Sequence, residues 1–374
     1  MQLVLANVGT PLVWASCAHL LIGNAVIGFG EGWLIWRLFK APRRDAAIRA
    51  MIIANYFSMT VGYFGGMALL RYFEDDIDRT ITVHNALAWQ FVLFALAFVL
   101  TLLLEWPFCA IAIGPRAGRA SVALRASLVA QSASYAVLVV LYSVVTSSVV
   151  GPFSGVHIDE PSRFANSRAA FIYYLSPDDG DVWRIHPDGS EREHVAAIAE
   201  KSCFARLCVQ KADEDDAWDL CLQPSSYSSA GRRVVRARFA RNPGISASER
   251  DAGRDAAGMS LFHAGAADLR PLDQRTWAVH TGFWPIEGLT AEQSGTSHVV
   301  HVAMETPFIM NWPTRYATIL PGDQVVYQLG AQIMLLDLNQ RKLGLITLGR
   351  GPVVVLDPPP DSTSRPGRDP AAQP

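Results

Sequence analysis

Two glutamates, Glu31 and Glu105, lie inside long apolar stretches of this 374-residue chain. A carboxylate is costly in a stretch that crosses a bilayer, so each one is a candidate functional residue. Asn24 lies seven positions before Glu31 and shares its helix face. Further amide and hydroxyl groups occur in the same half of the chain: Asn55, Ser58, Gln131 and Ser134. Such groups can hydrogen-bond one another, hold a proton, or bind a cation or a small polar ligand.

The spacing predicts that two of these amide side chains, Asn55 and Gln131, lie at the same depth in the membrane. Asn55 lies six positions after Arg49, and Gln131 lies six positions after Arg125. A helix rises about 1.5 Å per residue, so equal offsets from basic residues at a membrane surface give equal depths. A serine follows each amide by three positions, about one helical turn further along. We therefore expect one layer of polar side chains.

The same pattern indicates a duplicated helical hairpin. Each copy places a glutamate on one helix and an amide with a serine on the returning helix. Parallel copies would be related by an axis along the membrane normal. We expect Glu31 to meet Asn55, and Glu105 to meet Gln131 or Ser134. Two interpretations stay open: hydrogen bonds worth about 0.6 kcal/mol each that hold the bundle together, or a site for a proton, an ion or a small polar ligand.

Four apolar stretches must position these residues. Each is long enough to cross about 30 Å of hydrocarbon, which takes roughly 20 helical residues. They lie near residues 11–38, 47–70, 86–113 and 122–150. Residues 1–150 are therefore predicted to form a four-helix transmembrane domain in contact with the lipid bilayer.

The charge of the connecting loops predicts the orientation. Short loops rich in Lys and Arg stay in the cytoplasm. The first loop contains Arg37, Lys40, Arg43, Arg44 and Arg49; the third contains Arg116, Arg119 and Arg125; the second is acidic, with Glu74, Asp75, Asp76 and Asp78. We therefore expect a multi-pass plasma (inner) membrane protein whose N-terminus and C-terminal domain lie outside the cytoplasm.

The second half of the chain changes character. Residues 151–356 contain short apolar strands separated by turn residues, and residues 234–240 alternate between apolar and basic side chains, as a half-buried strand does. Residues 242–258 are rich in small and charged residues and predict a loop. Residues 357–374 form a Pro-rich tail without a core. The fold class is therefore α+β, with a helical bundle followed by an external all-β domain.

Two stretches of this half resemble blades of TolB-type β-propellers. They read FIYYLSPDDGDVWRIHPDGSERE from Phe171 and LPGDQVVYQLGAQIMLLDLNQRKLGLITLGRGPVVVL from Leu320. Each has a strand, a tight turn, and a strand that ends in an Asp-containing turn. The resemblance implies a small or incomplete propeller that acts as a binding platform. A β-sandwich is the alternative.

The cysteines predict at most one disulfide. Cys208 and Cys221 flank an expected hairpin and are the favoured pair, which leaves Cys203 over. Cys17 and Cys109 lie in apolar stretches and behave as small hydrophobic residues. The spacings match no metal motif or catalytic signature, and no cofactor is expected. No basic domain stands out, so the composition favours no nucleic-acid partner.

Three functions are compatible with these patterns. The first is a membrane-anchored scaffold whose β domain binds a protein or an envelope component. The alternative is a small transporter or proton- or ion-conducting protein built around Glu31 and Glu105. The third is an envelope enzyme with an unrecognised site.

Overall fold

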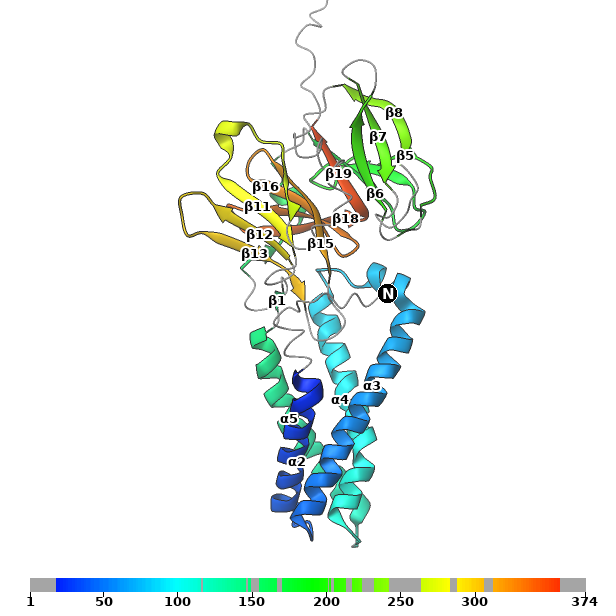
Figure 1. Cartoon of the computed structure of the whole chain (residues 1–374), viewed down its shortest axis with the longest axis vertical. Helices are drawn as coiled ribbons and strands as arrows, with labels where there is room; N and C mark the ends of the chain where they lie inside the picture. Colours follow the sequence, from blue (N-terminus) through cyan, green and yellow to red (C-terminus); the bar gives the residue numbers. More distant parts are fainter. Residues whose placement is uncertain are drawn as a thin grey trace, which may run out of the picture. The chain divides into compact units, whose positions relative to one another are not determined.

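The computed structural model describes residues 18–115, 117–145, 147–148, 155–166, 170–200, 202, 205–212, 217–223, 232–241, 264–282, 288–305 and 312–356. The chain divides into two compact units. The first contains Met1–Ser154 with the segments Trp284–Glu287 and Ala303–Trp312. Helices make up most of the first unit and strands the second (Figure 1), which confirms the predicted α+β class.

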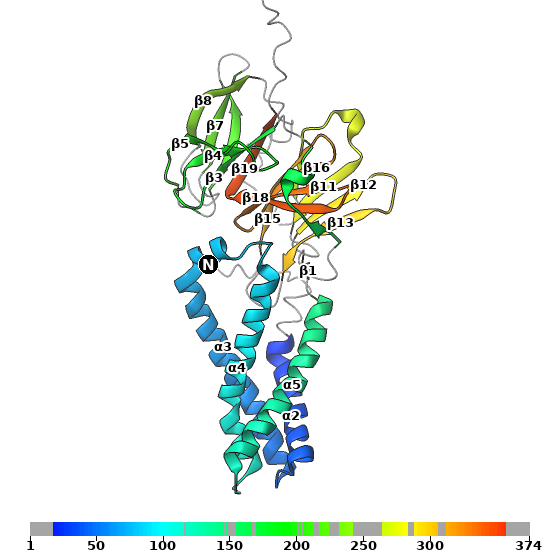
Figure 2. The same ribbon diagram turned by 180° about the vertical axis from the view of Figure 1, so that it is seen from behind.

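Four long helices form the helical unit. Their bounds are α2 Asn24–Phe39, α3 Arg44–Thr80, α4 Ala86–Ile113 and α5 Arg119–Val145. A π-helical turn, η1 (His19–Gly23), leads into α2, and residues 11–17 of the first predicted helix lie outside the described residues. Each helix packs against the next, and α2 also packs against α5 (Figure 2). Helix α4 and residues 119–142 of α5 are long and apolar enough to cross a membrane.

The prediction of an acidic loop at residues 74–78 is wrong, because helix α3 continues through these residues to Thr80. The sequence between residues 71 and 80 contains neither Gly nor Pro, so nothing in it interrupts the helical hydrogen bonds. A turn follows the helix. There Asn85 Oδ1 accepts the backbone N–H of Thr82 at 2.8 Å, and Asn85 Nδ2 donates to the carbonyl of Thr80 at 2.8 Å.

The fourth helix also differs at its end from the prediction, since α5 stops at Val145 rather than near residue 150. The sequence that follows, Thr-Ser-Ser-Val, is β-branched or polar and favours an extended backbone. Strand β1 (Ser147–Ser148) pairs antiparallel with β14 (Met304–Glu305) and forms a two-stranded sheet within the first unit.

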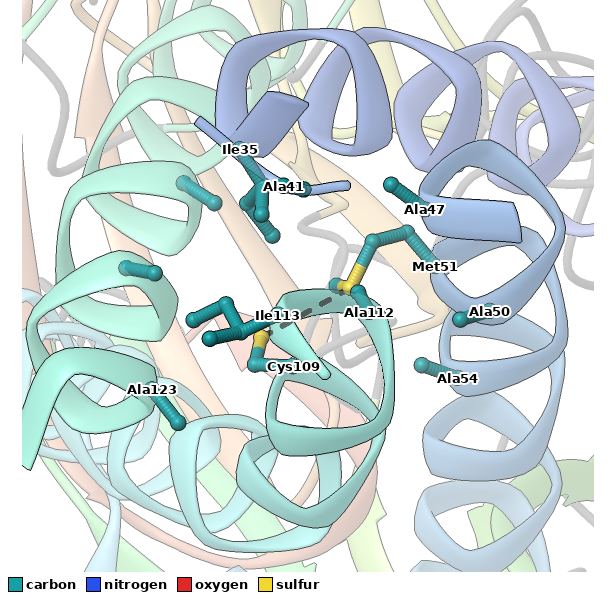
Figure 3. Packing of buried hydrophobic residues seen from close by; sticks show 12 residues of the cluster. Ile35, Ala41, Ala47, Ala50, Met51, Ala54, Cys109, Ala112, Ile113 and Ala123 are labelled. Atoms are coloured by element: carbon teal, nitrogen blue, oxygen red, sulfur yellow. Dashed lines mark hydrogen bonds between the residues drawn. The ribbon is translucent and has the colours of Figure 1, made fainter. Parts of the chain in front are cut away.

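Small side chains fill the buried core of the bundle (Figure 3). Most are alanines, and the Cys109 thiol of α4 contacts the Met51 sulfur of α3 at 3.6 Å. Two glycines of α2 lie against the α3 backbone. A Cβ atom at Gly28 would lie 2.6 Å from an α3 backbone atom, and one at Gly32 would lie 2.4 Å away. This Gly-x-x-x-Gly spacing lets α2 and α3 approach closely, as it does in many membrane helices.

The described residues of the β unit form sheets of six, four, four and three strands. One four-stranded sheet has the order β19-β3-β4-β5, with bounds Arg350–Leu356, Ala170–Leu175, Val182–Ile185 and Glu193–Ala196. The last described strand therefore pairs with the first long strand, with Leu356 opposite Ala170. The three-stranded sheet has the order β6-β7-β8, with bounds Arg206–Lys211, Ala217–Gln223 and Arg233–Arg241.

The other two sheets contain the remaining strands. The second four-stranded sheet has the order β13-β12-β11-β9, with bounds Val299–Val302, Gly288–Gln293, Trp277–Gly282 and Ala264–Gly265. The six-stranded sheet has the order β10-β15-β16-β17-β18-β2, with bounds Ala267–Asp268, Thr314–Leu320, Gln324–Leu329, Gln332–Asp337, Lys342–Leu348 and His157–Ile158. Two single 3-10 turns, Pro161–Arg163 and Leu272–Gln274, connect strands.

The sheet that contains β3 is buried on both faces, because successive side chains of a strand point to opposite sides. Tyr173 packs with Leu207 and Leu220 of the three-stranded sheet. Its neighbour Tyr174 packs with Val326 and Leu335 of the six-stranded sheet. The three sheets therefore stack as layers. No closed barrel or propeller is found among the described strands.

Candidate functional site in the helical bundle

Glu31 of α2 is 3% exposed and connects α2 with two other helices. The Asn55 amide of α3 donates to its Oε2 atom at 2.6 Å. The Ser134 hydroxyl of α5 donates to its Oε1 atom. Both carboxylate oxygens therefore have a side-chain hydrogen-bond partner, each from a different helix.

Glu105 of α4 is fully buried, with no exposed surface, and makes the matching contacts. The Ser58 hydroxyl of α3 donates to its Oε1 atom at 2.6 Å. The Gln131 amide of α5 donates to its Oε2 atom. Each glutamate thus accepts one amide and one hydroxyl, and each of α3 and α5 contributes to both carboxylates.

These contacts form a closed set that we call the polar ring: Glu31, Asn55, Ser58, Glu105, Gln131 and Ser134. Exchanging the two hairpins, α2–α3 for α4–α5, maps every one of the four hydrogen bonds onto another. The amide partners are the expected ones. Of the two partners expected for Glu105, Gln131 contacts it, whereas Ser134 donates to Glu31 of the other hairpin and Ser58 donates to Glu105.

Asn24 is buried but lies outside the polar ring. Its amide donates to the Leu20 carbonyl at 3.1 Å and to the Met59 sulfur at 3.0 Å. A spacing of seven residues is nearly two full helical turns, about 10 Å along the axis, so Asn24 shares the face of Glu31 at a different height.

The ring includes backbone acceptors that the sequence pattern did not reveal. The Ser134 hydroxyl also lies 3.0 Å from the Ala130 carbonyl, and the Ser58 hydroxyl lies 3.1 Å from the Asn55 carbonyl. A buried serine in a helix commonly bonds the carbonyl of the preceding turn, which is the signal that could have identified them. Each ring hydroxyl therefore has two acceptors within reach.

Two tyrosines of α5 make further polar contacts that the sequence pattern did not indicate. The Tyr135 hydroxyl lies 3.0 Å from the Thr101 hydroxyl of α4, and the Tyr142 hydroxyl lies 2.6 Å from Nδ1 of His19. Both contacts join helices that are adjacent in the bundle. Their only sequence signal is a polar atom on an otherwise apolar helix.

The charges around the ring are acidic only. Among the described residues, no positively charged side chain compensates Glu31 or Glu105, and the charge of Glu31 acts on Glu105. Among the same residues, no group of three or more His, Cys, Asp or Glu side chains could hold a metal ion. Burial without a counter-ion is unfavourable for two ionised carboxylates, and the hydrogen bonds offset only part of that cost.

The two predicted cysteine partners lie together in the β unit. Cys208 of β6 and Cys221 of β7 are directly opposite each other, and both are free thiols. Cys203 lies outside the described residues.

Compared with protein-family models, curated proteins and solved structures, the chain matches none of them.

Proposed function

We propose that this chain is a multi-pass membrane protein in which all four helices cross the bilayer and hold the β unit outside the cytoplasm. One observation carries the proposal. Among the described residues, every large apolar side chain that is exposed lies in η1 or in α2–α5, except Val234 and Val299. Exposure to water of an apolar surface that extends over four helices is unfavourable, whereas the lipid of a bilayer solvates such a surface.

The arrangement of the polar ring supports this assignment. Apolar residues face outward and hydrogen-bonding residues face inward, the reverse of a helical bundle in water. The exchange of hydrogen-bond partners between the hairpins also supports a duplication with an axis along the membrane normal. The cytoplasmic side is then the side of the α2–α3 and α4–α5 connections, where Lys40 and Arg119 lie.

Reporter fusions test the proposed topology. Fusions after Lys40 and Arg119 should read cytoplasmic, and fusions after Arg79 and Pro161 should read external. Alkaline extraction of membranes that contain the untagged chain should leave the chain in the pellet. An external signal from the Lys40 fusion, or release of the chain by alkali, would overturn the four-helix membrane proposal.

The activity that this architecture supports best is that of a membrane-anchored scaffold. The β unit would bind a protein or an envelope component, and the bundle would hold it in place. Successive antiparallel meanders and the pairing of β19 with the first sheet support a binding platform built from several stacked sheets. The full chain and a chain truncated after Ser154 can be purified from detergent in parallel. A component that co-purifies with the full chain alone supports the scaffold.

A second candidate, a proton-conducting or proton-coupled membrane protein, is favoured by the two serine hydroxyls. With an ionised carboxylate, each hydroxyl donates to it. With a protonated one, the acid O–H can donate to the serine oxygen while the hydroxyl turns to the carbonyl within 3.0–3.1 Å. The polar ring is therefore fully hydrogen-bonded in either state, as a proton site requires. Among the described residues, Cys109 and Tyr135 are titratable groups that also interact with the two carboxyls.

Infrared spectroscopy of the chain in lipid distinguishes the two candidates. A proton site should show carboxylic acid C=O bands that disappear one at a time in Glu31→Gln and Glu105→Gln. Ser134→Ala should shift the Glu31 band, and Ser127→Ala, seven residues earlier on the same helix, should leave it unchanged. Proton flux into vesicles that is lost in Glu31→Gln, with folding retained, would favour conduction over a scaffold. Carboxylate bands alone at neutral pH would exclude the proton site.

A further inference from the structure

Cys208 and Cys221 lie where a disulfide can form. They are directly opposite on the antiparallel strands β6 and β7, where paired Cα atoms are about 4.5–5.5 Å apart. A disulfide needs Cα atoms about 4.4–6.8 Å apart. The apolar core takes the other face of these strands, with Leu207 and Leu220 buried in it. The two thiols therefore do not belong to that core.

The two thiols differ in access. Cys221 is 1% exposed and lies on β7, the central strand, with β6 on one side and β8 on the other. Cys208 is half-buried on β6, which is at the edge of this sheet. Arg206 lies two residues before Cys208 and therefore on the same face. Arg206 and Arg232 place positive charge near the more accessible sulfur.

We propose that Cys208 and Cys221 form a redox-active dithiol that reacts with disulfides, with Cys208 as the attacking thiol and Cys221 as the resolving thiol. The Cys208 thiolate attacks one sulfur of an incoming disulfide, the S–S bond breaks, and the first leaving group departs as a thiolate that takes a proton from water. The Cys221 thiol then loses its proton and attacks the Cys208 sulfur, which releases the second thiol. The incoming disulfide is reduced to two thiols, and the chain gains one Cys208–Cys221 disulfide.

The electrostatics of the pair agree with these roles. The hydrogen bond from the Cys221 thiol, assisted by Arg232 and Arg206, lowers the pKa of Cys208 to about 7. The same hydrogen bond raises the pKa of Cys221. At neutral pH the thiolate is therefore on the accessible cysteine, and an attacking thiol reacts best when its pKa is near the ambient pH. This inference stands on the β unit alone and does not depend on whether the helices cross a membrane.

Oxidised glutathione and peptide mapping test the dithiol. Trypsin cleaves after Lys201, Arg206, Lys211 and Arg232, so Cys203, Cys208 and Cys221 fall on three separate peptides. The full chain in detergent is treated with oxidised glutathione, quenched with acid, digested and analysed by mass spectrometry. The wild-type chain should yield the Cys208 peptide linked to the Cys221 peptide, with little glutathione retained on either.

Two single variants assign the roles. Cys221→Ser should accumulate glutathione on Cys208, because nothing resolves the mixed disulfide. Cys208→Ser should leave Cys221 unmodified, because Cys221 is buried. The Cys208 adduct should form faster as the pH rises through about 7. A linked peptide that contains Cys203, an adduct on Cys221 in Cys208→Ser, or wild-type thiols that stay reduced would each overturn the proposal.

Discussion

The hydroxyl of Ser134 on α5 donates to Oε1 of Glu31 on α2, so a serine of the second helical hairpin completes the carboxylate site of the first. Ser58 of α3 does the same for Glu105 of α4. Each carboxylate therefore has hydrogen-bond donors from both hairpins, and neither hairpin provides both donors for its own glutamate. The bundle is held together by this exchange as well as by apolar packing.

The exchange predicts equal effects for the two serines. Ser134→Ala and Ser58→Ala should each lower the free energy of unfolding by about 0.6–2 kcal/mol, the usual range for an interhelical hydrogen bond. Reversible denaturation in mixed micelles measures the change. Ser127→Ala, buried on α5 and outside the ring, is the matched control and should change it less. A large loss for one ring serine and none for the other would contradict the symmetry.

Substitutions of Glu31 should separate hydrogen bonding from charge. Glu31→Gln keeps a hydrogen-bonding side chain and should cost little stability. Glu31→Leu leaves the Asn55 amide and the Ser134 hydroxyl without their partner and should destabilise by up to about 2 kcal/mol. The same denaturation assay measures both variants. Equal stability of the two variants would mean that the contacts of Glu31 contribute nothing to the bundle.

The close contact between α2 and α3 should not tolerate even one methyl group at Gly32. A Cβ there would lie 2.4 Å from the α3 backbone, so Gly32→Ala must separate the helices and should cost about 1–3 kcal/mol. Gly30→Ala, two residues earlier on the same helix, meets no atom within 4 Å and is the control. It should be neutral or stabilise by up to about 1 kcal/mol. Comparable losses in both variants would contradict the packing argument.

Asp181 should make the stability of the β unit depend on acid pH. Its carboxylate accepts the backbone N–H groups of Ala199 and Ile198 at 3.0 and 2.9 Å, and these bonds lower its pKa below the usual value. A depressed carboxyl pKa stabilises the folded state above the unfolded pKa of about 3.9 and loses this effect as the pH falls through the folded pKa.

Asp181→Asn should therefore melt below the wild type at neutral pH, and the difference should shrink below about pH 4. Thermal unfolding of the full chain, followed by tryptophan fluorescence, measures it at several pH values. Asp178→Asn changes a carboxylate on the same turn that accepts neither of these two bonds, so it should not reproduce the effect. A difference that is independent of pH would exclude the carboxylate as the cause.

The sequence predicted that these residues come together in one polar ring, but it did not predict all of their connections. Counting residues from Arg49 and Arg125 placed Asn55 and Gln131 in one layer, because the rise of a helix is constant. Counting does not say which way a helix is rotated or which helix lies across from it. Gln131 meets Glu105, one of the two contacts expected for that carboxylate, whereas the contact of Ser134 with Glu31 was therefore not anticipated.

In the β unit, too, the features that depend on nearby residues were predicted, and those that depend on distant residues were not. Alternation along residues 234–240 predicted β8, and turn residues predicted the hairpin of β6 and β7, because both signals are local. The short strand β2 was missed because its pairing partner β18 lies far away in the sequence. No local pattern indicates that β19 pairs with β3. The order of the sheets depends on such distant pairings, so the sequence alone did not reveal it.

The pairing of β19 with β3 has a consequence for how the protein is made. A ribosome releases β3 long before β19, so the sheet that contains β3 stays open at one edge throughout most of translation. Strand β2 is likewise synthesised long before its partner β18. An open strand edge can pair with a neighbouring chain. The nascent β unit therefore has to be kept apart from other copies until its last strand emerges. A premature stop codon just before β19 would leave that edge permanently exposed.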